Sequence, residues 1–153
     1  MANELTWTTP ASGPAESMPL GNGVAGANLW VTADGSIRMY LALTGAYSEN
    51  ARLLKLGRLV FRFDPPLDTA EFRWTLDPAR GEIRIREGGG AVSVGTAGAD
   101  TAAAKTAAAD GALGSSRLLL IVRFDVDAPV IRLTWTSAEK RSVTVDLQHW
   151  RNG

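Results

Sequence analysis

Hydrophobic and polar residues alternate with a period of two along most of the chain, a pattern typical of strands with one buried face. The alternation predicts strands near residues 27–31, 37–41, 58–63, 72–76, 83–86, 92–94, 117–126, 131–135 and 143–147. Turn-forming residues such as Asp34 with Gly35, and the run from Asp64 to Pro66, separate these strands. Many short strands joined by turns favour an all-β, antiparallel β-sandwich that forms one domain over residues 1–153.

Two strand signals are clearer than the rest. At residues 72–86, alternating apolar residues lie on both sides of the segment Asp77–Gly81, which suits a type I turn closed by a left-handed glycine. The segment Arg117–Val126 is apolar on both of its faces. We therefore expect a hairpin at residues 72–86 and a central strand of the sandwich at Arg117–Val126.

One segment, Gly95–Ser116, breaks the alternation because it is rich in alanine. Alanine favours helix, and Asp100 is a suitable N-cap. However, within this segment no large apolar residue occurs before Leu113, and isolated short helices are marginal in water. We predict a mobile Ala-rich loop at about residues 96–116, with a docked helix as the alternative.

Charge and composition narrow the class of function. Sixteen basic residues balance sixteen acidic ones, so the formal net charge is zero. Nucleic-acid and anionic-membrane binders usually carry a basic excess, so we expect neither partner. The chain has no cysteine, which excludes disulfides and cysteine-based metal sites. No signal-peptide pattern is visible, and no apolar stretch approaches ~20 residues, so we expect a soluble protein of unknown compartment.

The segment Gly21–Gly26 spells G-x-G-x-x-G, the sequence of dinucleotide-binding loops. That function requires a strand before the loop and a helix after it. Here no buried strand is predicted before Gly21, and the residues from Ala27 to Val31 alternate as a strand. We therefore predict a tight glycine turn with positive φ among Gly21, Gly23 and Gly26, and no cofactor.

Other chemistry-bearing residues also have simpler structural explanations. His149 is the only histidine, so it cannot build a histidine-based metal site, and we expect it partly buried on the last strand. Asp125 and Asp127 suit a turn at a strand end, although two carboxylates can also contribute to a calcium site. No pair of acids can be assigned to glycoside hydrolysis. We accordingly assign no catalytic and no metal-binding residue.

The five tryptophans fall into different groups. Trp74 and Trp135 fit the inward alternation of their strands and are predicted to lie in the core. Trp30 and Trp150 alternate away from their aliphatic neighbours. They are therefore the better candidates for contact with a ligand or a second domain, because an aromatic ring matches the apolar face of a sugar.

Several stretches of the chain together resemble a known family. They are Ser17–Gly23 with Asn28–Val31, Tyr47–Arg58, Phe72–Asp77 and Gly81–Ile83. In combination they resemble the start of family 95 glycoside hydrolases, the α-L-fucosidase and α-galactosidase type, and within it the subgroup known as domain of unknown function 5703. The resemblance spans about residues 4–95 and again about 117–150.

The resemblance implies a supersandwich-like N-terminal domain, followed in the family by an (α/α) barrel. The family's general acid and base lie in that barrel, which is absent from this sequence, so no catalytic residue carries over. The family's sandwich is expected to continue beyond Gly153, and this sequence then corresponds to an incomplete half of it. The Ala-rich segment departs from the family, where a tight strand connection is expected.

The sequence thus favours an accessory N-terminal domain of a carbohydrate-active hydrolase that packs on the absent catalytic domain. Its rim loops would be Met18–Gly26 and Tyr47–Lys55, since rigid sheets commonly present functional loops. The candidate inter-domain or ligand-rim residues are Asn22, Trp30, Tyr47, Glu49, Asn50 and Trp150. The alternatives are a stand-alone carbohydrate-binding domain and a self-assembling structural β domain, so carbohydrate and a second copy of the chain are further expected partners.

Overall fold

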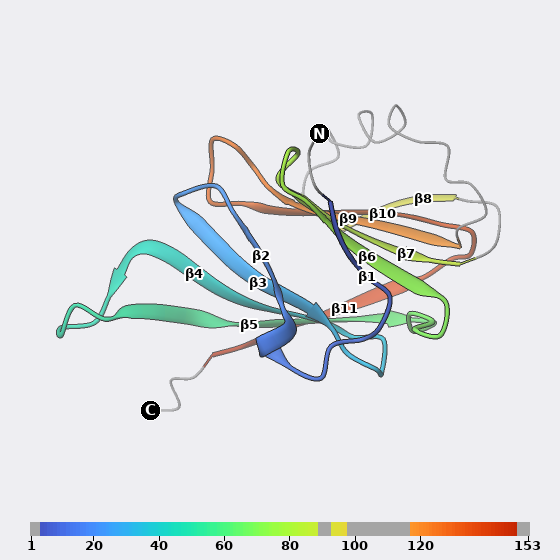
Figure 1. Cartoon of the computed structure of the whole chain (residues 1–153), viewed down its shortest axis with the longest axis horizontal. Coiled ribbons are helices and arrows are strands. Elements are labelled where there is room, and N and C mark those ends of the chain that lie inside the picture. The colour runs from blue at the N-terminus through green and yellow to red at the C-terminus, as the bar shows by residue number, and fades with distance from the viewer. Residues whose placement is uncertain (1–3, 89–92, 98–116, 150–153) are drawn as a thin grey trace.

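The computed structural model describes residues 4–88, 93–97 and 117–149, and these residues form two antiparallel sheets (Figure 1). The six-stranded sheet has the order β1-β6-β7-β9-β10-β8, and the five-stranded sheet has the order β11-β5-β4-β3-β2. The strands are β1 (Leu5–Trp7), β2 (Met18–Gly21), β3 (Ala25–Val31), β4 (Ile37–Tyr47), β5 (Leu53–Asp64), β6 (Phe72–Asp77), β7 (Glu82–Glu87), β8 (Ser93–Ala97), β9 (Leu118–Phe124), β10 (Ile131–Ser137) and β11 (Ser142–Gln148). The predicted all-β sandwich is confirmed.

The hairpin predicted at residues 72–86 is formed by β6 and β7. Gly81 closes its turn with a φ of 62°, in the left-handed region that glycine tolerates. The Asp77 carboxylate accepts hydrogen bonds from the backbone N–H groups of Ala79, at 3.0 Å, and Arg80, at 3.2 Å. The residue types of the turn therefore determine its geometry, as the sequence indicated.

The strand β9 is central, because it pairs with β7 on one side and β10 on the other. Its ends differ from the prediction. Arg117 precedes the strand, and the strand stops at Phe124. Val126 lies exposed in the turn that follows, where the Asp125 N–H donates to the Val130 carbonyl. The predicted strand was therefore too long, because Val126 is apolar but belongs to the turn.

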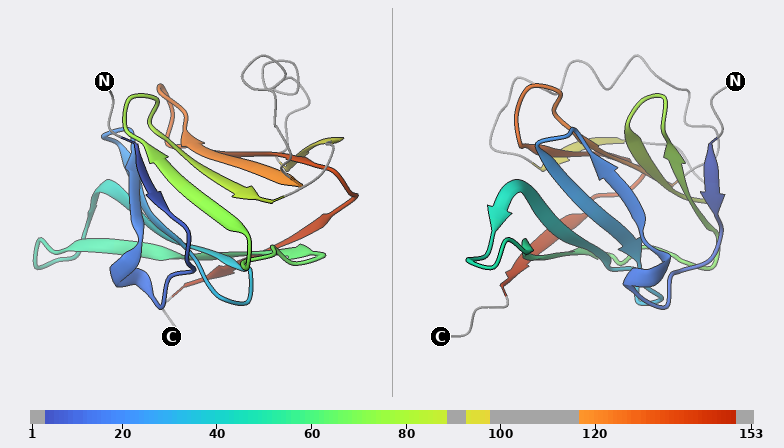
Figure 2. Two further views of the ribbon diagram at one scale, coloured as in Figure 1. Left: turned by 45° about the vertical axis from the view of Figure 1, so that its right-hand side comes forward. Right: turned by 60° about the vertical axis from the view of Figure 1, so that its left-hand side comes forward.

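The main core lies where the two sheets approach each other. Its fully buried side chains include Met18, Leu29 and Met39 from the five-stranded sheet and Trp74, Ile83 and Leu120 from the six-stranded sheet. The two sheets diverge toward β8 and β11, as the left-hand view of Figure 2 shows. In the described part of the chain, the sandwich is therefore closed along one side and open along the other.

Three details of the predicted strands were wrong. Met18–Gly21 is a strand, with Met18 and Leu20 buried and Pro19 on a sheet edge, where its missing N–H costs no ladder bond. Val60 was assigned to the outer face of β5 but is buried. The strand β8 includes residues 95–97, and the remainder of the Ala-rich segment, residues 98–116, lies outside the described residues.

None of the described residues forms a helix long and apolar enough to cross a membrane.

Candidate interaction surfaces

The glycine-rich segment is the turn of the β2–β3 hairpin. Gly23 has a φ of 87°, whereas Gly21 and Gly26 do not have positive φ, so the prediction is correct for one glycine of the three. A strand, β3, follows the turn in place of the helix that a dinucleotide site requires. The segment therefore has the geometry of a β-hairpin turn.

Asn22 lies in this turn, and both ends of its side-chain amide form hydrogen bonds. Its Oδ1 accepts from the N–H groups of Val24, at 3.0 Å, and Ala25, at 2.9 Å. Its Nδ2 donates to the carbonyls of Asp125, at 2.7 Å, and Ala128, at 2.9 Å. Asn22 thus joins the five-stranded sheet to the β9–β10 turn of the other sheet. Both N–H donors and both acceptor positions are occupied, which leaves the amide little capacity for a ligand.

The β9–β10 turn that Asn22 contacts is held by charged groups. The Asp125 carboxylate accepts from Arg132 Nη2 at 2.6 Å and Nε at 2.9 Å. The hydrogen bond from Arg132, followed by that from the Asp127 N–H, holds the pKa of Asp125 below its usual value. The prediction of a strand-end turn is confirmed. Among the described residues, no group of three or more metal-ligating side chains occurs.

Trp30 is buried, with 1% of its surface exposed. It points away from Leu29 and Val31, as the alternation indicated, but the outer face of the sheet is covered at this point. The 3-10 turn η1 (Pro14–Glu16) contacts β3, and the Tyr40 ring meets the Trp30 ring edge-on, with centroids 4.8 Å apart. The assignment of Trp30 to a ligand or inter-domain surface was therefore wrong.

The outer ends of β4 and β5, residues 42–56, extend beyond the rest of the sandwich, and we call them the β4–β5 arm (Figure 1). The predicted rim residues Tyr47, Glu49 and Asn50 lie exposed at its tip. Tyr47 and Leu53 are opposite each other in the register, and 56% and 57% of their surfaces are exposed. The arm therefore presents apolar surface to solvent next to polar tip residues.

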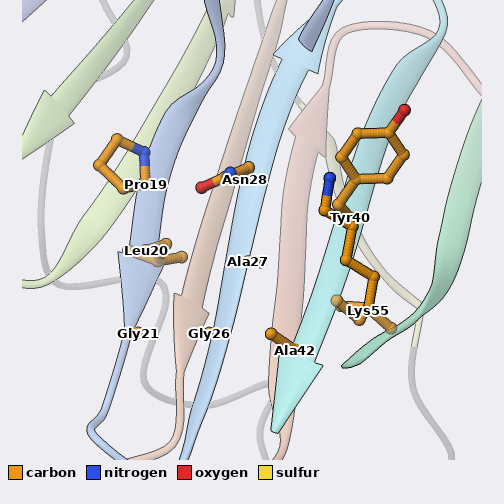
Figure 3. A pocket seen from close by; sticks show the side chains of 10 residues that line it. Pro19, Leu20, Gly21, Gly26, Ala27, Asn28, Tyr40, Ala42 and Lys55 are labelled. Carbon is orange, nitrogen blue, oxygen red and sulfur yellow. The ribbon is translucent and has the colours of Figure 1, made fainter. Parts of the chain in front are cut away.

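A shallow hollow of about 340 Å³ lies over β2, β3 and β4 (Figure 3). Gly21, Gly26 and Ala42 form its low floor. Asn28 is exposed beside the floor, and Lys55 Nζ lies 4.7 Å from the centre of the Tyr40 ring. An aromatic ring, an amide and an ammonium group are thus available in one hollow, which the sequence patterns did not predict.

A second hollow of about 350 Å³ opens between the sheets on the open side, and we call it the inter-sheet groove. Its lining residues are all apolar and come from three strands: Leu59, Phe61 and Phe63 of β5, Ile131, Leu133 and Trp135 of β10, and Val143 and Val145 of β11. Trp135 is only partly buried and meets the Phe63 ring edge-on at 5.9 Å. It lies against the core as predicted, but it also forms part of an open surface.

A buried ion pair fixes the start of β11. Arg141 and Glu87 have almost fully buried side chains, and Arg141 Nη1 lies 2.8 Å from a Glu87 carboxylate oxygen. Arg141 Nη2 also donates to Glu87 at 2.9 Å and to Glu139 at 2.7 Å. Burial opposes the Arg141 charge, but these hydrogen bonds outweigh it and raise the pKa of Arg141. The sequence patterns missed this pair because charged residues on alternating strands are normally assigned to solvent.

The last residues of the described chain bear on two predictions. His149 follows β11 and is exposed, so its predicted partial burial was wrong because the strand ends one residue earlier. Trp150 lies outside the described residues.

The fold and these surfaces define a β-sandwich domain with apolar surface on an arm and in an inter-sheet groove. The model of one family, domain of unknown function DUF5703, matches residues 6–96, which is more than half of the chain. The chain therefore belongs to this family. No curated protein matches the chain, and no solved structure matches it. The matched residues include the β4–β5 arm and the Asn22 turn, whereas β9, β10 and β11 lie beyond them.

Proposed function

We propose that this sandwich is an accessory domain of a carbohydrate-active hydrolase, and that it docks on a separate catalytic domain through the β4–β5 arm. The observation that carries the proposal is the exposure of Tyr47 and Leu53 on an arm that extends from the sandwich. Exposed apolar patches with a polar rim mark interaction surfaces. Leu56 adds exposed apolar surface to the same arm.

The link to hydrolases is supported by the sequence motifs. The segments Ser17–Val31 and Tyr47–Arg58 resemble the fucosidase-like family, and the second of these segments contains the tip of the arm. In this proposal, the arm contributes the rim of a sugar-binding cleft whose reacting acids belong to the other domain. Glu49 and Asn50 then supply polar groups at the rim, and Tyr47 supplies an aromatic face.

The test uses the purified chain together with a purified (α/α)-barrel catalytic domain of the fucosidase-like family. The two are mixed, the complex is measured by size-exclusion chromatography with light scattering, and hydrolysis of aryl α-L-fucosides and aryl α-D-galactosides is followed. We expect no hydrolysis by the chain alone and a complex that Leu53→Lys or Leu56→Lys disrupts. Val126→Lys is the matched control, because Val126 is an exposed apolar residue on a different turn.

Two results would contradict this function. The first is hydrolysis by the isolated chain that a point substitution in its described residues abolishes. The second is equal binding of the catalytic domain by the arm variants and by Val126→Lys.

A stand-alone carbohydrate-binding role is the second candidate, and the hollow of Figure 3 favours it. Asn28 and Lys55 can donate hydrogen bonds to sugar hydroxyls beside the Tyr40 ring. Calorimetric titration with fucose, galactose and their oligosaccharides tests this role. Binding that Asn28→Ala abolishes and Thr144→Ala preserves would support it, because Thr144 is exposed on β11, away from the hollow.

A further inference from the structure

The strand β11 forms one edge of the five-stranded sheet and is paired in the described structure only with β5. Its residues alternate in type: Val143, Val145 and Leu147 face the inter-sheet groove side, and polar residues lie between them. Val145 and Leu147 remain 47% and 63% exposed. The strand thus presents an apolar row beside an edge whose outer backbone groups have no partner strand among the described residues.

Within the residues that the structure describes, this edge lacks the usual sequence features that protect against strand pairing. Natural edge strands are commonly protected by proline, by inward-pointing charges or by a bulge. The sequence of β11 contains no proline, and its register with β5 is continuous over seven residue pairs. Its one charged residue, Asp146, is already engaged by Arg62 of the neighbouring strand.

We propose that β11 pairs antiparallel with β11 of a second copy of the chain, about a two-fold axis that is perpendicular to the sheet and passes midway between the two copies of Val145. In this register, Val145 lies opposite its own counterpart, and Val143 lies opposite Leu147 of the second copy. The two five-stranded sheets then join into one continuous sheet. This inference is independent of the proposed accessory function.

The charges of the strand favour a second copy as the occupant. With Val145 at the centre, Asp146 of each copy faces Thr144 of the other, so no like charges are opposed. The formal net charge of zero adds no long-range repulsion between copies. A strand that is self-complementary in both its apolar and its polar rows meets the requirement of an isologous interface.

A second copy in this position also covers the exposed apolar side chains of β11. A two-fold axis perpendicular to the sheet keeps the groove-facing rows of both β11 strands on the same side of the joined sheet. Cross-strand neighbours in such a pair have Cβ atoms roughly 5 Å apart, which is apolar contact distance for valine and leucine. The second copy therefore covers Val145 and Leu147 and extends the apolar wall of the groove.

The test is a charge-swap experiment on the full chain. Sedimentation velocity over a range of concentrations should show the unmodified chain dimerising to about twice its 16.3 kDa mass. Val145→Lys and Val145→Glu place like charges on the axis, so each should raise the dimer dissociation constant by about tenfold or more. An equimolar mixture of the two variants should dimerise again, because opposite charges then meet at the axis.

Val24→Lys is the matched control, since Val24 is 52% exposed and lies on the β2–β3 turn, and it should leave dimerisation unchanged. A chain that is monomeric at all concentrations would overturn the proposal. So would a dimer that both Val145 variants retain, or a mixture that stays monomeric although each variant is folded. If a variant does not fold, hydrogen exchange on the unmodified chain decides, because the β11 amides should gain protection as concentration rises.

Discussion

On the closed side of the sandwich, where β2, β3 and β4 contribute to one core with β6, β7 and β9, the inward-facing side chains are almost fully buried. On the open side, where β5 and β11 face β10, Leu59, Leu133 and Trp135 are only partly buried and line a groove. The two sides have the same strand chemistry, with alternating apolar residues on antiparallel ladders. They differ only in whether the opposite sheet lies close enough to exclude water.

This difference in burial separates the side chains that stabilise the fold from those that remain available to contact a partner. Hydrophobic stabilisation scales with the apolar area removed from water, at roughly 25 cal/mol per Å². Side chains of the closed side therefore contribute most of the folding free energy. Side chains of the open side retain apolar area that a partner can still bury. The following substitutions test that division, beginning with the largest expected effect.

Trp74→Ala should destabilise the chain far more than Trp135→Ala. Trp74 is fully buried on the closed side, and its indole N–H donates to the Thr9 carbonyl at 3.1 Å. Removing it should cost about 3–5 kcal/mol of unfolding free energy. Trp135 is partly buried, so its removal should cost less than about 2 kcal/mol. Urea unfolding at low protein concentration measures both, and equal losses would abolish the distinction between the two sides.

Glu87→Gln tests whether the ion pair at the start of β11 holds the open side to the closed side. The substitution removes the buried carboxylate partner of Arg141 and leaves only the exposed Glu139 to balance its charge, so the unfolding free energy should fall by about 3 kcal/mol. Removing both charges, as Glu87→Gln with Arg141→Met, should restore part of that stability because no buried charge is left unpaired. A double variant whose loss is the sum of the single losses would show that the two residues act independently.

The sequence predicted the closed side well, because its strands have strong local signals. The β6–β7 hairpin has turn residues with definite backbone preferences, and β9 is apolar on both faces because it is central. The strand β2 was missed because Pro19 and Gly21 are residue types that usually occur in turns. Only at a sheet edge are they compatible with a strand.

The candidate surfaces were less predictable, because exposure depends on what covers a side chain. Alternation gave the correct face for Trp30, but the side chain is buried there because the η1 turn and the Tyr40 ring pack against β3. The tip residues of the arm are exposed as expected, since a long hairpin extends beyond its neighbours. The inter-sheet groove depends on the angle between the two sheets, and no local pattern in the sequence specifies that angle.

Asn22→Ala should weaken the link between the sheets at the opposite end from the ion pair, with a smaller effect. Four hydrogen bonds are lost, two of them to the β9–β10 turn, but water can replace some of them because Asn22 is only half-buried. We expect a loss of about 1–2 kcal/mol in unfolding free energy. Asn28→Ala, on the exposed face of β3, is the matched control and should change stability by less than about 0.5 kcal/mol. Equal effects of the two substitutions would contradict a linking role for Asn22.

The smallest expected effect concerns a single turn of the closed side and appears only in acid. Asp34 accepts hydrogen bonds from the Thr32 hydroxyl at 2.6 Å and from the Ser36 hydroxyl at 2.8 Å. The bond from Thr32 is the largest cause of the lowered pKa of Asp34, which falls from 3.8 to about 2. Because the folded pKa lies below the unfolded one, the folded chain binds this proton less readily. The ionised carboxylate therefore stabilises the fold above about pH 4, and that contribution is lost as the pH falls toward 2.

Asp34→Asn should consequently lower the unfolding free energy at pH 5 and have almost no effect at pH 2. The Asp34 side chain is more than half exposed, so solvent screening keeps the difference small. Thr32→Val sharpens the test because it removes the hydrogen bond that lowers the pKa most. It should raise the pKa of Asp34 in the folded chain toward its usual value. Urea unfolding at pH 5, 3 and 2 compares the stabilities, and NMR titration of the Asp34 carboxyl carbon follows its protonation. A midpoint near 3.8 in the folded, unmodified chain would show that the turn does not hold the carboxylate as the hydrogen bonds indicate.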